Sequence, residues 1–128
     1  MKTKIFLTTV ILTVVILTSC SNRLIGTWTI QKYETTAEGK QAVELNNIGT
    51  ITFNRGGDGE KDITYTVFGN IKEDKTKFQW TSKDNYVKIE SENSDFSKKW
   101  IVIYDNKKSQ KWRSIDQNNQ DEILELTK

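Results

Sequence analysis

Two patterns of hydrophobic positions divide the chain of 128 residues. The first is an uncharged and mainly apolar run from Phe6 to Leu17, which follows Lys2 and Lys4. A basic start followed by a short apolar run is typical of a secretory signal, and this run is shorter than the ~20 residues that a membrane-spanning helix needs. We therefore expect residues 1–19 to form a cleavable signal peptide.

After Cys20 the pattern changes to short segments in which apolar and polar residues alternate. Alternation with a period of two predicts β-strands with one buried face, and the polar clusters between the segments predict turns. The expected strands are Ile25–Glu34, Ile48–Asn54, Ile63–Gly69, Lys77–Thr81, Asn85–Ser91, Lys99–Asp105, Lys111–Ile115 and Glu122–Thr127. The sequence therefore predicts one antiparallel domain over residues 24–128.

Each predicted strand has one apolar face, so a flat sheet would leave that face bare and two edges unpaired. Closure solves both problems, and a barrel of about eight strands has an interior that side chains fill or that holds one small ligand. The fold prediction is an all-β, about eight-stranded antiparallel up-and-down barrel, preceded by the cleavable signal helix. A two-sheet sandwich is the alternative.

The first strand illustrates the expected orientation of side chains. Trp28 and Ile30 fall on the face that should point inward, and Tyr33 falls on the opposite face. The segment from Ala37 to Asn47 breaks the alternation. We expect it to form a short helix or a long loop that covers one barrel end.

Cys20 is the only cysteine in the chain, which excludes an intramolecular disulfide. The segment Leu17-Thr18-Ser19-Cys20 resembles the lipobox, in which the cysteine becomes the acylated N-terminus of a bacterial lipoprotein. The resemblance implies lipid attachment at Cys20, with residues 20–23 as a short tether. Two or more acyl chains hold a protein stably at a bilayer. A membrane is therefore the first expected partner.

Charge and composition limit which other partners and which kinds of chemistry we expect. Removal of Lys2 and Lys4 reduces Lys+Arg from 19 to 17, which equals the 17 Asp+Glu, so the mature domain is formally neutral. A neutral chain with no run of Lys and Arg interleaved with aromatic residues argues against nucleic acid as a partner. The absence of histidine removes the usual general base and the commonest metal ligand. We expect no enzyme activity, catalytic residue, metal or cofactor, and we interpret the glycine-rich Arg55–Gly59 as a hairpin turn.

Gly26-Thr27-Trp28 at the start of the first strand is similar to the Gly-x-Trp signature of the lipocalins and fatty-acid-binding proteins. The layout of the chain also resembles the lipocalin-like lipoproteins of Bacteroidetes. In that family the tryptophan closes one barrel end beneath a basic side chain from a late strand. The resemblance implies a barrel-closing pair of Trp28 and Arg113.

Large side chains on the inward faces either fill the interior or line a ligand cavity. The candidate cavity-lining residues are Trp28, Ile30, Phe53, Tyr65, Phe78, Trp80, Trp100 and Trp112. The expected function is a monomeric, membrane-anchored lipoprotein that binds a small apolar ligand. The alternative is a protein-binding module, such as a periplasmic inhibitor or immunity lipoprotein, that acts through its loops. Ser21 and Asn22 carry no acidic group, and we expect the periplasmic face of the outer membrane.

Overall fold

The computed structural model describes residues 21–37, 39–67, 69–115 and 119–128. The expected signal peptide and Cys20 lie outside these residues. The described chain begins with one helical turn, α1 (Ser21–Leu24). Nine strands follow in the described residues: β1 (Gly26–Thr36), β2 (Val43–Phe53), β3 (Asp58–Val67), β4 (Asn70–Asp74), β5 (Lys77–Lys83), β6 (Tyr86–Glu90), β7 (Lys99–Asp105), β8 (Ser109–Ile115) and β9 (Asp121–Thr127).

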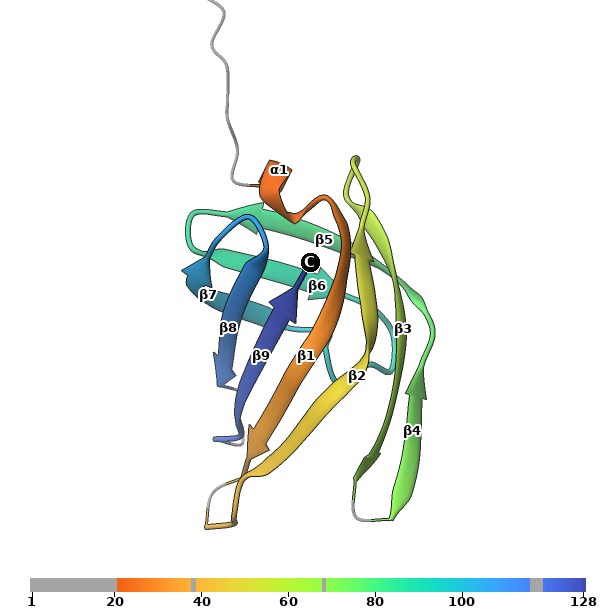
Figure 1. Ribbon diagram of the computed structural model, residues 1–128, viewed down its shortest axis with the longest axis vertical. Coiled ribbons are helices and arrows are strands. Elements are labelled where there is room, and N and C mark those ends of the chain that lie inside the picture. Colours follow the sequence, from red (N-terminus) through yellow and green to blue (C-terminus); the bar gives the residue numbers. More distant parts are fainter. Residues whose placement is uncertain (1–20, 38, 68, 116–118) are drawn as a thin grey trace, which may run out of the picture.

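The strands form one antiparallel sheet in the order β2-β1-β9-β8-β7-β6-β5-β3-β4, and a further pairing between β2 and β3 closes it (Figure 1). Ile63–Val67 of β3 pairs with β4, whereas Asp58–Glu60 pairs with β5 on the same side of β3. Because β4 and β5 share one position in the ring, the closed barrel has eight positions. The predicted all-β up-and-down barrel is confirmed, and the sandwich alternative is wrong.

Strand direction alternates around the ring, so the turns gather at two ends. The β2–β3, β5–β6 and β7–β8 turns lie at the end that carries α1, which we call the α1 end (Figure 1). The β1–β2, β3–β4, β6–β7 and β8–β9 connections lie at the opposite end, which we call the open end. The chain segment that precedes Ser21 therefore joins the barrel at the end opposite the β1–β2 hairpin.

Aromatic side chains fill the barrel interior. Trp28, Trp100 and Trp112 are completely buried. The Phe53 ring packs edge-on against those of Phe78, Trp80 and Trp112 at centroid distances of 5.4, 5.3 and 5.9 Å. A ring of this kind buries about 150–250 Å², which at ~25 cal/mol per Å² contributes roughly 4 kcal/mol or more to folding.

The segment from Ala37 to Asn47 corrects one prediction. It supplies the first half of β2, which begins at Val43 and pairs with the long C-terminal arm of β1, so that Tyr33 lies opposite Leu45. The helix or loop that we expected over a barrel end is therefore wrong beyond residue 42. Pairing with β1 supplies backbone hydrogen bonds that the polar sequence of this segment does not reveal.

A bulge in β1 corrects the expected orientation of Tyr33. The register of β1 against β9 shifts between Ile30 and Lys32, because β1 has one extra residue there, Gln31. The register against β2 shifts at the same place, with the extra residue in β2. An extra residue inverts the alternation that follows it. Tyr33 is therefore buried, and Lys32 lies on the outside among three glutamates.

Candidate binding site at the open end

A pocket of about 630 Å³ opens at the open end, between the ends of β1 and β9 on one side and of β3 and β4 on the other. The loop from Ser91 to Lys98, between β6 and β7, forms a third wall. The charged and aromatic side chains in the lining are Tyr33, Tyr65, Lys72, Asp95, Lys98 and Glu122. The pocket therefore combines two phenol rings with two cations and two carboxylates.

Glu122 forms the polar centre of the β1–β9 wall. It is only 1% exposed, because it occupies an inward position of β9. Its carboxylate accepts a hydrogen bond from the Tyr33 hydroxyl and forms an ion pair with the Lys98 ammonium. Burial, together with the charge of Glu122, raises the pKa of Tyr33 well above its ordinary value, so the phenol stays protonated and remains a donor.

Asp95 lies in the Ser91–Lys98 loop, which forms the third wall, and contacts residues of β3 and β4. Its Oδ2 accepts hydrogen bonds from the Tyr65 hydroxyl at 2.6 Å and from Lys72 Nζ at 3.3 Å. Burial alone would raise the pKa of Asp95, but the hydrogen bonds from Tyr65 and Lys72 outweigh it and hold this pKa below its usual value. Burial, with the Asp95 hydrogen bond, raises the pKa of Tyr65. Each phenol in the pocket thus donates to a carboxylate.

Phe96 packs behind Tyr33 and Tyr65, two of the residues that line the pocket, and we call it the floor. Its ring is completely buried and lies 4.9 Å from the Tyr33 ring and 6.3 Å from the Tyr65 ring, measured between centroids. On the inner side its ring is stacked against Trp100 at 6.4 Å, and the Trp100 indole donates to the Phe96 carbonyl oxygen at 3.1 Å. Phe96 therefore separates the pocket from the aromatic core.

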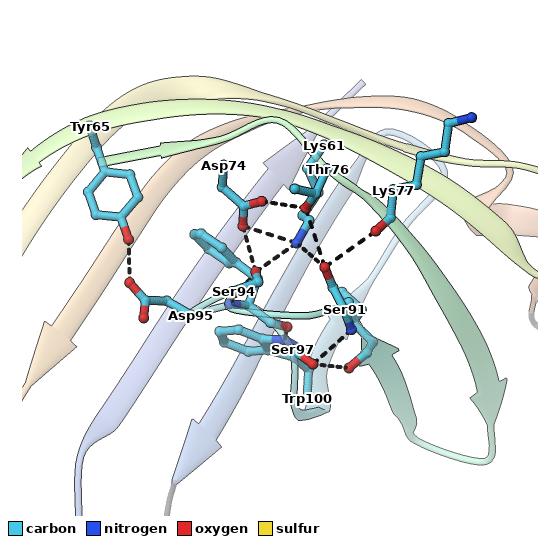
Figure 2. Close-up of polar contacts among 12 residues, drawn as sticks. Lys61, Tyr65, Asp74, Thr76, Lys77, Ser91, Ser94, Asp95, Ser97 and Trp100 are labelled. Carbon is cyan, nitrogen blue, oxygen red and sulfur yellow. Dashed lines mark hydrogen bonds and ion pairs between the residues drawn. The ribbon is translucent and has the colours of Figure 1, made fainter. Parts of the chain in front are cut away.

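A polar cluster fixes the loop that carries Phe96 (Figure 2). Lys61 Nζ, from an inward position of β3, donates to Asp74 Oδ2 at 3.0 Å, to Ser91 Oγ at 3.1 Å and to Ser94 Oγ at 2.7 Å. Ser94 in turn donates to Asp74 Oδ2 at 2.5 Å and accepts from the Phe96 amide at 3.1 Å. These residues, which we call the Lys61 cluster, attach the start of the loop to β3 and β4.

The Lys61 side chain has no exposed surface, and Asp74 is only 10% exposed. Burial lowers the pKa of Lys61, and the hydrogen bond and charge of Asp74 oppose that shift. The Ser94 hydroxyl donates to the Asp74 carboxylate, and the same carboxylate pairs with the Lys61 ammonium. The cluster therefore acts as a satisfied ion pair that holds the loop in place.

The eight candidate cavity-lining residues all lie in the buried core. Tyr65 is the member of this set that also lines the open-end pocket. Sequence reasoning missed the other charged and aromatic residues of the pocket: Tyr33, Lys72, Asp95, Lys98 and Glu122. One signal was present in the sequence, because Glu122 shares the inward face of its strand with Leu124 and Leu126.

The expected pair of Trp28 and Arg113 needs a correction. Arg113 points outward, since it lies between the inward residues Trp112 and Ser114, and its guanidinium donates two hydrogen bonds to Asp121 at 3.0 and 2.9 Å. The cation over the Trp28 ring is Lys128, whose Nζ lies 4.9 Å from the ring centroid. Lys128, which directly follows β9, thus covers Trp28 in place of Arg113.

Local contacts at the α1 end surround Trp28. The Trp28 indole donates to the Leu24 carbonyl oxygen at 2.8 Å, and Lys128 Nζ donates to the Ile25 carbonyl oxygen at 2.8 Å. Leu24 itself is 3% exposed. These contacts fix α1 against the barrel and leave the open end as the entrance to the pocket described above.

No protein-family model matches the chain, and no curated protein matches it. A redesigned β-barrel of known structure is similar to it, with 16% sequence identity and a TM-score of 0.45 over 85% of this chain and 94% of that chain. The strand pairing described above is what establishes the barrel.

Among the described residues, no helix has both the length and the apolar character needed to cross a membrane. Over the same residues, no group of three or more Asp or Glu side chains is arranged to hold a metal ion.

Proposed function

We propose that this protein is a lipid-anchored binding protein of the cell envelope, and that a small amphipathic ligand occupies the open-end pocket. The anchoring rests on the sequence at Cys20, and the lipocalin character rests on Gly26-Thr27-Trp28. The observation that carries the binding proposal is the pocket of about 630 Å³. This volume lies in the range of about 300–1,000 Å³ that is usual for small-molecule sites.

The lining favours a ligand with a polar head over a wholly apolar one. The Tyr33 and Tyr65 rings offer aromatic surface, with Phe96 packed behind them, and Lys72 and Lys98 offer donors beside them. The interior below Phe96 is filled by tryptophan rings, so the long apolar tail that a deep lipocalin cavity accommodates has little room here. We therefore replace the expected apolar ligand with an amphipathic one.

The Lys61 cluster and the two tyrosine–carboxylate pairs also support binding at this end. They fix the walls and the floor of the pocket before a ligand arrives, so little side-chain entropy remains to be lost on binding. The pocket is therefore preorganised.

The proposal is tested by titrating the exported protein with the amphipathic anion 1-anilinonaphthalene-8-sulfonate and following its fluorescence. We expect saturable binding at one site. Asn70→Trp, which places a large ring on the rim of the pocket, should weaken binding at least tenfold. Glu73→Trp is the matched control, because Glu73 is exposed on the same strand outside the pocket lining.

Equal effects of the two tryptophan substitutions would contradict binding at the open end. Lys72→Gln gives a second measurement, because loss of one exposed cation beside the sulfonate should weaken binding a few-fold. The tryptophan variants should retain the unfolding midpoint of the unmodified protein, which separates a lost site from a lost fold.

One observation favours the alternative of a protein-binding module. Ile71 of β4 is 71% exposed, and among the described residues β4 pairs with β3 alone. An exposed apolar residue on an edge strand is typical of a surface that adds a strand from another protein. A photo-crosslinking residue at position 71 in intact cells should give one discrete protein adduct under this alternative. The small-ligand proposal predicts no discrete adduct there.

A further inference from the structure

The α1 end carries an excess of positive charge. Its turns and adjoining residues present six cationic side chains: Arg23, Arg55, Lys83, Lys107, Lys108 and Lys128. The described residues of the same turns and adjoining positions include three carboxylates, Asp58, Asp84 and Asp105. The expected mature chain is formally neutral as a whole. Positive charge is therefore concentrated at the α1 end, and the rest of the barrel carries the compensating negative charge.

Exposed apolar side chains lie next to the basic β7–β8 turn. The register between β7 and β8 shifts between Val102 and Tyr104, so two consecutive residues, Ile103 and Tyr104, both face outward. Each is 52% exposed. Neighbouring aliphatic and aromatic side chains beside lysines are the composition of a surface that enters the boundary between lipid headgroups and acyl chains.

The position of this surface relative to the chain start identifies what covers it. Cys20 immediately precedes Ser21, the first residue of α1, and Arg23 of α1 forms an ion pair with Asp105 at the end of β7 at 3.5 Å. Acyl chains on Cys20 would therefore enter a bilayer directly beside Ile103, Tyr104 and the basic turn. Figure 1 shows α1 and the β7–β8 turn side by side at this end.

We propose that the α1 end is a membrane-contact surface that rests on a bilayer containing anionic phospholipids. This inference rests on the proposed anchoring at Cys20. Arg55, Lys83, Lys107 and Lys108 meet the acidic headgroups, and Ile103 and Tyr104 insert beside them. The barrel axis then points away from the bilayer, and the open-end pocket faces the aqueous compartment.

The test uses the full chain after processing in a bacterial host, reconstituted into phosphatidylethanolamine vesicles with or without 30% (~0.3 mole fraction) phosphatidylglycerol as the anionic lipid. A fluorophore is attached at Asn85→Cys on the α1 end or at Lys40→Cys on the open end, because acylation leaves Cys20 without a reactive thiol. Asn85 is exposed in the β5–β6 turn and carries no charge, so the label removes none of the cations. Quenching by nitroxide-labelled lipid then reports how close each label lies to the bilayer. Lys107→Gln/Lys108→Gln is the test variant, and Lys75→Gln/Lys77→Gln, with two exposed lysines on the barrel side, is the control.

We expect strong quenching at position 85 in phosphatidylglycerol vesicles and little at position 40. The Lys107→Gln/Lys108→Gln variant should lower the equilibrium for the contacting orientation by about fivefold for each lysine removed, and the control pair should not. Equal quenching at positions 85 and 40 would overturn the proposal. So would quenching at position 85 that changes neither with phosphatidylglycerol nor with removal of Lys107 and Lys108. So would a dimer in detergent that Ile103→Ser dissociates, because the surface would then belong to a second copy.

Mass spectrometry of the N-terminal peptide separates this inference from the proposed function. An unacylated Cys20 would contradict the anchoring and with it the membrane-contact surface. An acylated Cys20 with equal quenching at the two labels would leave the anchoring intact and contradict only the surface.

Discussion

Lys61 of β3 and Asp74 of β4 form an ion pair at 3.0 Å inside the wall of the barrel, with the lysine side chain fully shielded from water. Both partners are also bound by hydroxyl groups: Thr76 donates to Asp74 at 2.7 Å, and Ser94 contacts both. This pair fixes the loop that forms the pocket floor. It thereby links the closure of the barrel to the geometry of the candidate site.

Asp74→Asn should lower the free energy of unfolding by about 3 kcal/mol, because removal of one partner leaves a buried charge without compensation. Chemical denaturation monitored by tryptophan fluorescence measures this change. Asp62→Asn is the matched control, because the Asp62 side chain is 72% exposed, and it should change stability by less than about 0.5 kcal/mol. Equal losses in the two variants would show that the Lys61–Asp74 pair does not hold the loop.

Phe96→Ala should cost roughly 3–5 kcal/mol, since it removes a fully buried ring and leaves a cavity between the pocket and Trp100. Hydrogen exchange of the Ser91–Lys98 backbone should accelerate in the variant. The exposed ring of Tyr104 provides the comparison, and Tyr104→Ala in solution should have an effect below about 1 kcal/mol. A Phe96 variant as stable as the Tyr104 variant would contradict the placement of Phe96 as the floor.

Gly49→Ala should prevent closure of the barrel. Gly49 lies in β2 opposite Ile63, at φ 142°, and a β-carbon there would lie 2.0 Å from the Asp62 carbonyl oxygen. Such a clash with backbone is relieved only if β2 separates from β3. Gly39→Ala is the control, since φ is 74° but no atom lies within 4 Å, and it should cost only about 1–2 kcal/mol. Retention of a folded, cooperative Gly49 variant would contradict the β2–β3 pairing.

The open end should contribute to acid sensitivity through Asp95. The pKa of Asp95 in the folded protein lies below its ordinary value of 3.8, so the unfolded chain takes up the proton first as the pH falls. The stabilisation from Asp95 is therefore complete above pH 3.8 and is lost as the pH falls through the lower pKa of the folded state. Urea unfolding between about pH 6 and pH 2 should show a smaller loss of stability in Asp95→Asn than in the unmodified protein. Identical pH profiles would contradict the hydrogen bonds from Tyr65 and Lys72.

Much of the fold could be predicted because inward positions with large apolar residues mark most strands. Trp80, Val87 and Ile89 are examples, and all three are buried in the core as their alternation indicates. The first half of β3 escaped prediction because its inward residues are Gly59 and Lys61. Glycine is needed there to admit the Phe78 ring, which would lie 2.4 Å from a β-carbon, and lysine is needed for the buried ion pair.

The candidate site was harder to predict than the barrel, for two physical reasons. Tyr33 reaches the pocket only because the bulge at Gln31 inverts the alternation of β1, and a bulge of this kind leaves no mark in a hydrophobic pattern. Phe96 and Asp95 lie in a polar segment between strands, and their positions depend on the distant Lys61. Such contacts are set by tertiary structure, which a single sequence does not display.

The most direct test of the account is a nuclear magnetic resonance titration with 1-anilinonaphthalene-8-sulfonate, followed at the backbone amides and at the four tryptophan indole N–H groups. In the structure these indoles donate to Leu24, Asp58, Phe96 and Gln110 within a filled interior. The account predicts shifts at the amides of Thr35, Lys72, Asp95 and Lys98, which line the open-end pocket, with the Trp28 and Trp112 indole signals unchanged. Large shifts at Trp28 and Trp112 with unchanged open-end amides would contradict it, because the ligand would then occupy the barrel interior.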